Sequence, residues 1–175
     1  TAHAHKRIIV VETMGRTAGW IALGGGLTSY ADAILIPERP FNKKSLLNFI
    51  REKKKTQRGF LCVVSEGAFA KGDSAEVAFE VENSPQAERF GGIGKKLARW
   101  FDKETGWESR QVVLGHLQRS KPPTATDRFL TLAMGLEVAK LAHNKQWGRA
   151  AVYKNGIVQS APLTDIMKPA RLVDS

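Results

Sequence analysis

Residues 10–16 read Val-Val-Glu-Thr-Met-Gly-Arg, and this stretch decides how we expect the chain to fold. The apolar, β-branched run at residues 7–12 predicts a buried strand, residues 13–16 a sharp turn, and residues 17–30 a helix. In open α/β folds, ligands bind at the carboxyl ends of strands, where the next helix directs its first N–H groups at them. Arg16 is therefore suited to an anion, although a glycine turn with a solvated arginine explains the same residues.

The remaining apolar runs continue the α/β pattern. Helical spacing of apolar residues follows Asn42, whose side chain can cap a helix, and recurs around residues 93–101. Further buried strands are predicted by short apolar runs at residues 33–36, 60–64 and 111–114.

Polar side chains follow two of these strands. Glu66, directly after the strand at residues 60–64, can accept hydrogen bonds from sugar hydroxyls or can simply cap its own loop. His116 and Arg119 follow the strand at residues 111–114. A guanidinium presents a rigid fork of donors that suits phosphate, and the imidazole can bond to a phosphate or a hydroxyl. A lone histidine is more often an ordinary satisfied polar residue, so both interpretations stay open.

These motifs resemble those of the phosphofructokinase family and occur in the family's order. Met14-Gly15-Arg16 after a valine-rich strand is similar to the family's motif for binding fructose 6-phosphate. The resemblance covers nearly the whole chain but only the second half of the family's protein. It implies a three-layer, Rossmann-like α/β substrate-binding domain. The other matching segments are residues 36–38, 65–67, 104–106, 110, 113–119 and 127–128.

The resemblance also implies roles for individual residues. Arg16 and Arg119 would be catalytic, and Arg119 could stabilise charge in the transition state. Arg7 and Arg110 match arginines that the family inserts into a neighbouring subunit's site, and both fall at predicted strand starts. Within one subunit, the substrate would be bound by Met14, Gly15, Arg16, Glu66, His116, Leu117, Gln118 and Arg119.

Phosphofructokinases transfer a phosphoryl group from ATP or pyrophosphate to O1 of fructose 6-phosphate, a glycolytic step that gives fructose 1,6-bisphosphate. The chemistry needs a donor cradle, Mg²⁺ and a base. In the family the donor loop and the aspartate base come from the first half, and these 175 residues contain neither. We therefore expect a fragment that supplies the sugar-phosphate side and is inactive alone, with Mg²⁺ bound mainly by the missing half and no metal ligand here. The alternative is a non-catalytic sugar-phosphate-binding or regulatory module.

Residues 70–90 bear on the phosphoryl donor. Residues 70–89 predict a polar surface loop with room for one short element, longer than in compact bacterial ATP-dependent enzymes. The following Phe-Gly-Gly-Ile-Gly at residues 90–94 is similar to the branch with pyrophosphate-dependent and mixed-donor enzymes. Residues 91–96 lack the spacing of a phosphate-binding loop, so a phosphate contact there is the weaker interpretation. Ser-Lys at residues 120–121 replaces the family's Gly-Gly, which implies a different loop path.

The last third of the chain predicts a helix and a hairpin. Residues 126–143 form a long helix that is apolar on several faces and needs burial on more than one side. Asn-Gly at residues 155–156 is a strong hairpin signal. The resemblance implies that both elements belong partly to a missing nucleotide-side domain. We expect a sugar-phosphate domain, a crossover part and a return segment at residues 1–115, 116–162 and 163–175.

Composition limits the partners. With 42% hydrophobic and 25% charged residues the chain resembles a soluble globular protein, and no apolar run approaches the ~20 residues of a membrane span. The net charge of +10 favours acidic partners, but no basic stripe interleaved with aromatic residues suggests nucleic acid. Polar residues 1–5 indicate no secretory signal, and the single Cys62 suits a reducing cytoplasm. We expect a cytoplasmic homo-dimer or homo-tetramer with no nucleic-acid or membrane partner.

Overall fold

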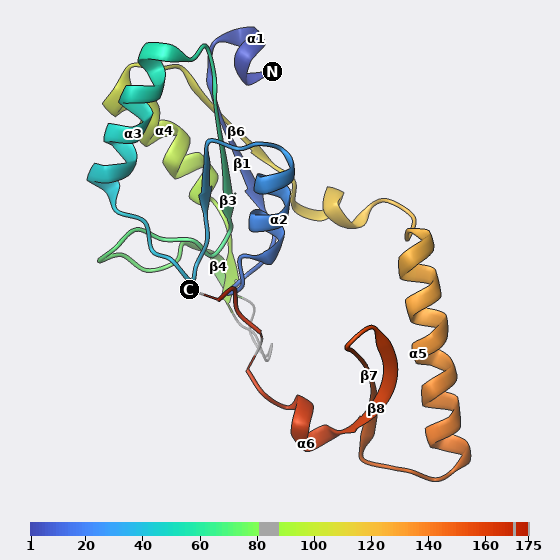
Figure 1. Cartoon of the computed structure of the whole chain (residues 1–175). Coiled ribbons are helices and arrows are strands. Elements are labelled where there is room, and N and C mark those ends of the chain that lie inside the picture. Colours follow the sequence, from blue (N-terminus) through green and yellow to red (C-terminus); the bar gives the residue numbers. More distant parts are fainter. Residues whose placement is uncertain (81–87, 170, 175) are drawn as a thin grey trace. The chain divides into compact units, whose positions relative to one another are not determined.

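The computed structural model describes residues 1–80, 88–169 and 171–174 (Figure 1). The chain separates into two compact units. The first contains residues 1–119 together with the chain end from Arg171, and the second contains residues 120–170. The two units are described separately below.

The first unit is built on a sheet of four parallel strands, β1 (Ile8–Thr13), β2 (Ala33–Leu35), β3 (Phe60–Ser65) and β6 (Ser109–Val113). The strand order is β2-β3-β1-β6, so β1 is central. Ile8 lies level with Phe60 of β3 and with Ser109 of β6, and Thr13 lies level with Ser65. Because the strands are parallel and in register, the residues that follow β1, β3 and β6 emerge at one edge of the sheet.

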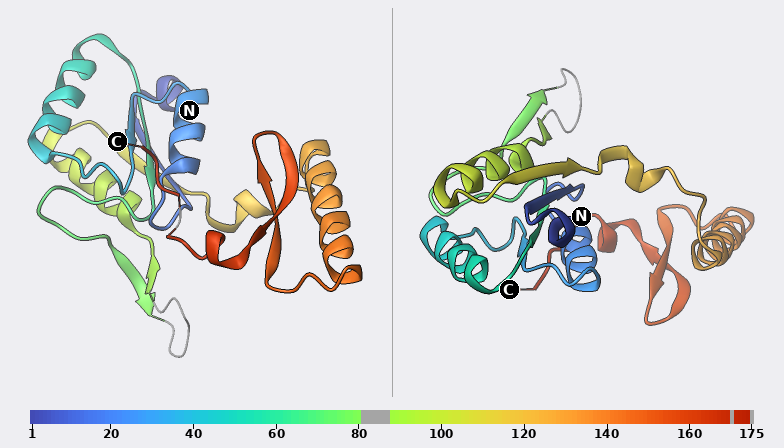
Figure 2. Two further views of the ribbon diagram at one scale, coloured as in Figure 1. Left: turned by 60° about the horizontal axis from the view of Figure 1, so that its bottom comes forward. Right: turned by 90° about the horizontal axis from the view of Figure 1, so that it is seen from above.

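Three helices flank this sheet, α2 (Trp20–Thr28), α3 (Lys43–Thr56) and α4 (Ile93–Thr105). Figure 2 shows α2 on one face and α3 with α4 on the other. Val10 and Cys62 join the core beneath α3 and α4, whereas Val63 packs with Ala22 of α2. Successive residues of a strand point to opposite faces, so an almost continuously apolar strand is buried on both sides. The predicted three-layer α/β fold is therefore confirmed.

Some boundaries differ from the prediction. α2 begins at Trp20 rather than at residue 17, because the turn continues to Ala18, whose N–H donates to the carbonyl oxygen of Gly15 at 2.9 Å. A short helix that we did not predict, α1 (Ala2–His5), precedes β1. The N-cap is confirmed, since Asn42 accepts a hydrogen bond from the N–H of Ser45 at 2.9 Å.

The segment predicted as a surface loop contains two strands. β4 (Val77–Glu80) pairs antiparallel with β5 (Glu88–Phe90), where we expected at most one element. Ala70 is 3% exposed, so the segment begins in the core rather than on the surface. Short strands that pair only with each other show little alternation of apolar and polar residues, and this segment is also rich in charge. For that reason the sequence did not predict the two strands. Residues 81–87 of the predicted loop lie outside the described residues.

The second unit contains α5 (Ala125–His143), β7 (Arg149–Lys154), β8 (Ile157–Pro162) and α6 (Leu163–Ile166). Asn155 and Gly156 both have positive φ, 54° and 83°, as a two-residue hairpin turn requires. The predicted helix and hairpin are confirmed. Leu141 is the only buried residue of α5, and Phe129 is 75% exposed, so the unit itself covers little of this apolar helix. In the described part of the chain, no helix combines the length and apolar character needed to cross a bilayer.

Candidate functional site

The turn after β1 is held by a carboxylate from the end of β3. Glu66 Oε1 accepts hydrogen bonds from the backbone N–H groups of Gly15 at 3.2 Å and Arg16 at 3.0 Å. The N–H of Glu66 donates to the carbonyl oxygen of Thr13 at 2.9 Å, so the two loops are tied in both directions. Glu66 therefore caps a neighbouring turn. Its second oxygen, Oε2, has no hydrogen-bond partner among the described residues, which leaves it accessible to a ligand hydroxyl.

A 3₁₀-helix, η1 (Gly115–Arg119), follows β6 where we predicted a simple turn. Gln118 Oε1 accepts a hydrogen bond from the N–H of Met14 at 2.8 Å, which joins this helix to the turn after β1. The imidazole and the guanidinium of η1 form no hydrogen bond or ion pair with a described residue. The exposed predicted site residues in η1 are His116, Leu117 and Arg119.

Arg16 is constrained at several points. Its φ of 52° lies in the left-handed region that non-glycine residues rarely adopt. Its carbonyl oxygen lies against Gly67, where a Cβ atom has no room. Its guanidinium Cζ lies 5.8 Å from the ring centroid of Phe90, in cation–π geometry. Strained backbone that is held by several contacts is typical of functional sites.

Arg16 also lines a pocket of about 240 Å³. Arg16, Glu38, Gly67, Phe69 and Phe90 are among its lining residues, and Glu66 and His116 are not. The pocket therefore extends from the turn toward β5 and not toward η1.

The backbone N–H of Gly19, the N-cap residue of α2, is already occupied. Glu38, after β2, accepts hydrogen bonds from the N–H of Gly19 at 2.9 and 3.1 Å and from the N–H of Val173 at 3.0 Å. Burial alone raises the pKa of Glu38, but these backbone donors outweigh it and hold the pKa below its ordinary value. The N–H of Gly19 is therefore not free to bind a ligand.

The glycine-rich segment before α4 also binds a carboxylate of its own chain. Glu12, which is 3% exposed, accepts hydrogen bonds from the N–H groups of Gly92 at 3.1 Å and Gly94 at 2.7 Å. A Cβ atom on Gly94 would lie 2.9 Å from Glu12 Oε2, so the close approach requires glycine. A phosphate contact through these two amides is therefore excluded while Glu12 occupies them.

Arg7 and Arg110 lie together at the amino ends of β1 and β6, as their sequence positions predict. One carboxylate joins them, since Arg7 Nε donates to Glu108 Oε2 at 2.8 Å and Arg110 Nη2 donates to Glu108 Oε1 at 2.7 Å. Each arginine uses one of its five donors in this bridge. Two guanidinium groups are thereby presented side by side at the edge of the sheet opposite to the Arg16 turn.

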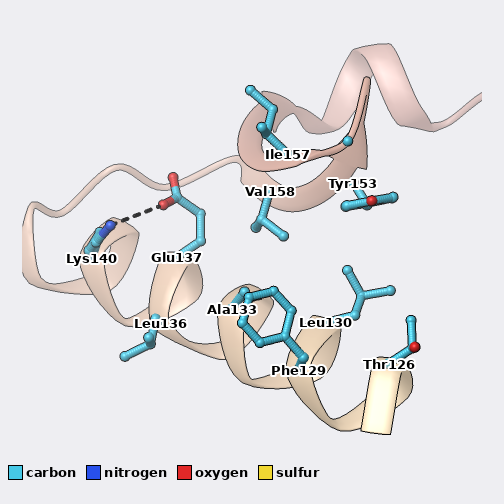
Figure 3. A pocket seen from close by; sticks show the side chains of 11 residues that line it. Thr126, Phe129, Leu130, Ala133, Leu136, Glu137, Lys140, Tyr153, Ile157 and Val158 are labelled. Carbon is cyan, nitrogen blue, oxygen red and sulfur yellow. Dashed lines mark ion pairs between the residues drawn. The ribbon is translucent and has the colours of Figure 1, made fainter. Parts of the chain in front are cut away.

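The second unit has a pocket of a different kind (Figure 3). It has a volume of about 460 Å³ and lies between α5 and the hairpin, with Phe129, Leu136, Tyr153 and Ile157 in its wall. The two charged residues that line it, Glu137 and Lys140, pair with each other at 3.7 Å. This pocket therefore offers apolar surface rather than cations for a phosphate.

No group of three or more His, Cys, Asp or Glu side chains within residues 1–80, 88–169 and 171–174 is arranged to hold a metal ion. The structure also reveals contacts that sequence reasoning did not predict, those of Glu12, Glu38, Phe90 and Glu108. Glu12 carried a signal, because a charge at the end of a buried apolar strand needs partners. Glu38 and Phe90 stand in segments that resemble the family, but nothing in the sequence indicated their contacts. Glu108 lies two residues from one partner, Arg110, whereas its other partner, Arg7, lies 101 residues away.

Comparison with known proteins assigns the family. A family model described as "Phosphofructokinase" matches residues 1–142. The chain belongs to the phosphofructokinase family. The solved structure of a pyrophosphate-dependent phosphofructokinase from Nitrosospira multiformis is similar in fold, with a TM-score of 0.77 over 96% of this chain and 42% of that chain at 23% identity.

The curated relatives of this phosphofructokinase-family chain are named for different phosphoryl donors. The pyrophosphate–fructose 6-phosphate 1-phosphotransferase of Thermoproteus tenax is 42% identical over 173 residues, 99% of this chain and 49% of the relative. The ATP-dependent 6-phosphofructokinase of Mycobacterium tuberculosis is 38% identical over 176 residues, 99% of this chain and 51% of the relative. The chain thus spans about half the length of the curated relatives it matches.

Proposed function

We propose that this chain supplies the sugar-phosphate side of a 6-phosphofructokinase. The reaction is phosphoryl transfer from pyrophosphate or ATP to O1 of fructose 6-phosphate, which gives fructose 1,6-bisphosphate in glycolysis. The support is membership of the family together with one observation. The loops after β1, β3 and β6 carry the Met-Gly-Arg turn, Glu66 and the His116–Arg119 helix at the carboxyl edge of one parallel sheet.

The residues divide by chemistry. Glu66 Oε2 would accept a hydrogen bond from a sugar hydroxyl, while Oε1 holds the turn after β1 in place. His116 and Arg119, exposed at the end of β6, would bind phosphate oxygens, and Arg119 together with Arg16 would stabilise charge on the transferring group. Met14, Gly15, Leu117 and Gln118 would line the sugar, with Gln118 also fixing the N–H of Met14.

We assign binding of the phosphoryl donor to residues outside these 175. Mg²⁺ would be bound mainly by a donor half, since phosphoryl transfer couples the ion to the donor phosphates. Relatives named for pyrophosphate and for ATP both match at similar identity, so either donor fits this half. The insertion at residues 70–90 favours the pyrophosphate or mixed branch. We place the enzyme in the cytoplasm, where its substrates occur.

A homo-oligomer is part of the proposal. Arg7 and Arg110 are exposed or half-exposed, lie away from Arg16, and keep most of their donors free of partners among the described residues. They would reach the phosphate of a neighbouring subunit's substrate in a dimer or tetramer. Residues 1–115 would form the sugar-phosphate domain. Residues 116–162 would belong partly to a donor-side domain, and residues 163–175 would form a C-terminal return segment.

A second candidate is a non-catalytic sugar-phosphate-binding or regulatory module. Its support is that these 175 residues contain neither the family's donor loop nor its aspartate base. Both candidates predict binding of fructose 6-phosphate, and they differ in turnover once a donor half, Mg²⁺ and pyrophosphate or ATP are present.

The test is titration of the 175-residue chain with fructose 6-phosphate by calorimetry. We expect saturable binding that Arg119→Gln weakens at least about tenfold, the loss of a charge-assisted contact of about 1.4 kcal/mol or more. Arg99→Gln is the matched control, since it removes one exposed arginine from α4. Equal effects of the two substitutions, or no binding by the unaltered chain, would contradict the proposal.

A further inference from the structure

Phe90 contacts the charged end of Arg16, with 5.8 Å between the guanidinium Cζ and the ring centroid. We propose that Phe90 is a positioning residue, which holds the guanidinium of Arg16 in the orientation that binds an anionic ligand. The inference rests on the proposed function, in which Arg16 contacts the sugar phosphate or the transferring phosphoryl group.

Among the described residues, the other contacts of Arg16 fix only its backbone. Glu66 accepts from its N–H at 3.0 Å, Gly67 lies against its carbonyl oxygen, and its φ is 52°. These contacts set the position of Cα and the direction of Cβ. The guanidinium lies several rotatable bonds further out, and ordering so flexible a side chain costs about 1.5–2 kcal/mol of entropy. A separate contact at the guanidinium is therefore needed to direct it.

The ring holds the guanidinium in a way that leaves it competent to bind. A cation–π contact brings no opposite charge to the guanidinium, so the positive charge of Arg16 is not neutralised by the ring. Among the described residues, no acceptor forms a hydrogen bond with the guanidinium N–H groups. Glu38 lines the same pocket, but its oxygens accept from the backbone of Gly19 and Val173. Arg16 is thus oriented without being neutralised.

The position of Phe90 is itself set by the strand that leads to Arg16. Glu12 of β1 binds the N–H groups of Gly92 and Gly94, directly after Phe90. The N–H of Gly91 donates to the carbonyl oxygen of Glu76 at 3.2 Å. The backbone that carries the ring and the backbone that carries the guanidinium are therefore both held at the end of β1. Such support of a binding group by surrounding residues is what a preorganised site requires.

The test compares Phe90→Leu, which keeps bulk but removes the aromatic face, with Phe90→Tyr, which keeps the face. By NMR, we expect the side-chain protons of Arg16 to be shifted upfield by the ring in the unaltered chain and in Phe90→Tyr, but not in Phe90→Leu. We expect Phe90→Leu to raise the dissociation constant for fructose 6-phosphate about two- to fivefold, the loss expected for one partly exposed cation–π contact. Phe90→Tyr should restore the affinity.

Phe49→Leu is the matched control, because Phe49 makes the same kind of contact with Lys53, at 5.4 Å. It should leave the affinity unchanged. Absence of the upfield shift in the unaltered chain, or unchanged affinity in Phe90→Leu, would overturn the inference. If the shift is present but fructose 6-phosphate does not bind, the proposed function is wrong. The inference then stands only if inorganic phosphate perturbs the Arg16 signals more weakly in Phe90→Leu, and it fails if the two chains respond alike.

Discussion

The carboxylate of Glu12 lies 2.7 Å from the backbone nitrogen of Gly94, a residue 82 positions later in the chain. Its other oxygen lies 3.1 Å from the nitrogen of Gly92, and the side chain is 3% exposed. A buried carboxylate is tolerated only when donors replace the water that it loses. Glu12 thereby joins the end of the central strand to the start of α4.

Replacing Glu12 should destabilise the first unit without changing its fold. In Glu12→Gln one oxygen still accepts from an N–H group, whereas the new amide group cannot, so one of the two backbone donors loses its acceptor. We expect the free energy of unfolding to fall by about 2–3 kcal/mol, the usual cost of losing a hydrogen bond to a charged group. Urea denaturation followed by circular dichroism measures this. The control Glu104→Gln, on the exposed end of α4, should change it by less than about 0.5 kcal/mol, and a similar small value for Glu12→Gln would refute the prediction.

The bonds between Glu66 and the Arg16 turn predict a local effect. Glu66→Ala removes the acceptor of two backbone N–H groups, those of Gly15 and Arg16, and should lower the free energy of unfolding by about 1–3 kcal/mol. In Glu66→Ala, amide hydrogen exchange should become faster at Arg16 than in β3, because the left-handed turn opens more easily than the strand. Glu66→Gln keeps an acceptor and should exchange more slowly than Glu66→Ala. Unaltered exchange at Arg16 in Glu66→Ala would show that the turn is held by something else.

The hydrogen bond between Glu38 and the N–H of Val173 predicts that the attachment of the C-terminal residues weakens in acid. Burial raises its pKa, but the N–H groups of Val173 and Gly19 lower it more, so the folded pKa lies below the ordinary 4.5. A depressed carboxyl pKa contributes stability above the unfolded pKa, and this stability is lost as pH falls through the folded value. The amide signal of Val173 should therefore move on titration from pH 5 into the acid range. Glu38→Gln should abolish that titration, and a persisting titration in this variant would assign it to another group.

Cys62 predicts a thiol that is inert while the protein is folded. Its side chain is fully buried in β3, and burial, with a smaller contribution from Asp32, raises its pKa from 9.0 to about 12. Iodoacetamide should therefore alkylate it only after denaturation, as measured by mass spectrometry. Because the folded state retains the proton, the stability that this thiol contributes is present below pH 9 and is lost progressively between pH 9 and 12. Cys62→Ala should remove this alkaline component, and rapid labelling of the native chain would contradict the prediction.

Local sequence patterns were sufficient for most elements of the fold. The β-branched runs form β1 and β3, Asn42 caps α3, and Asn155-Gly156 makes the hairpin turn. Strand periodicity, capping and turn geometry depend on residues a few positions apart, so they can be recognised in one dimension. The placement of candidate site residues at strand ends follows from the same patterns, because parallel strands must end at a common edge.

Side-chain partnerships required the tertiary structure. Glu12 with Gly94, Phe90 with Arg16, and Glu108 with Arg7 each join segments separated by more than 70 residues. A carboxylate or an aromatic ring carries the same chemistry wherever it occurs, and its partner is set by how strands and helices pack. The sequence by itself therefore determined most of the helices and strands and predicted the sheet edge at which the candidate site lies. Only the packed fold decided which groups occupy the glycine amides, the helix start and the face of Arg16, since these contacts exist only after distant segments meet.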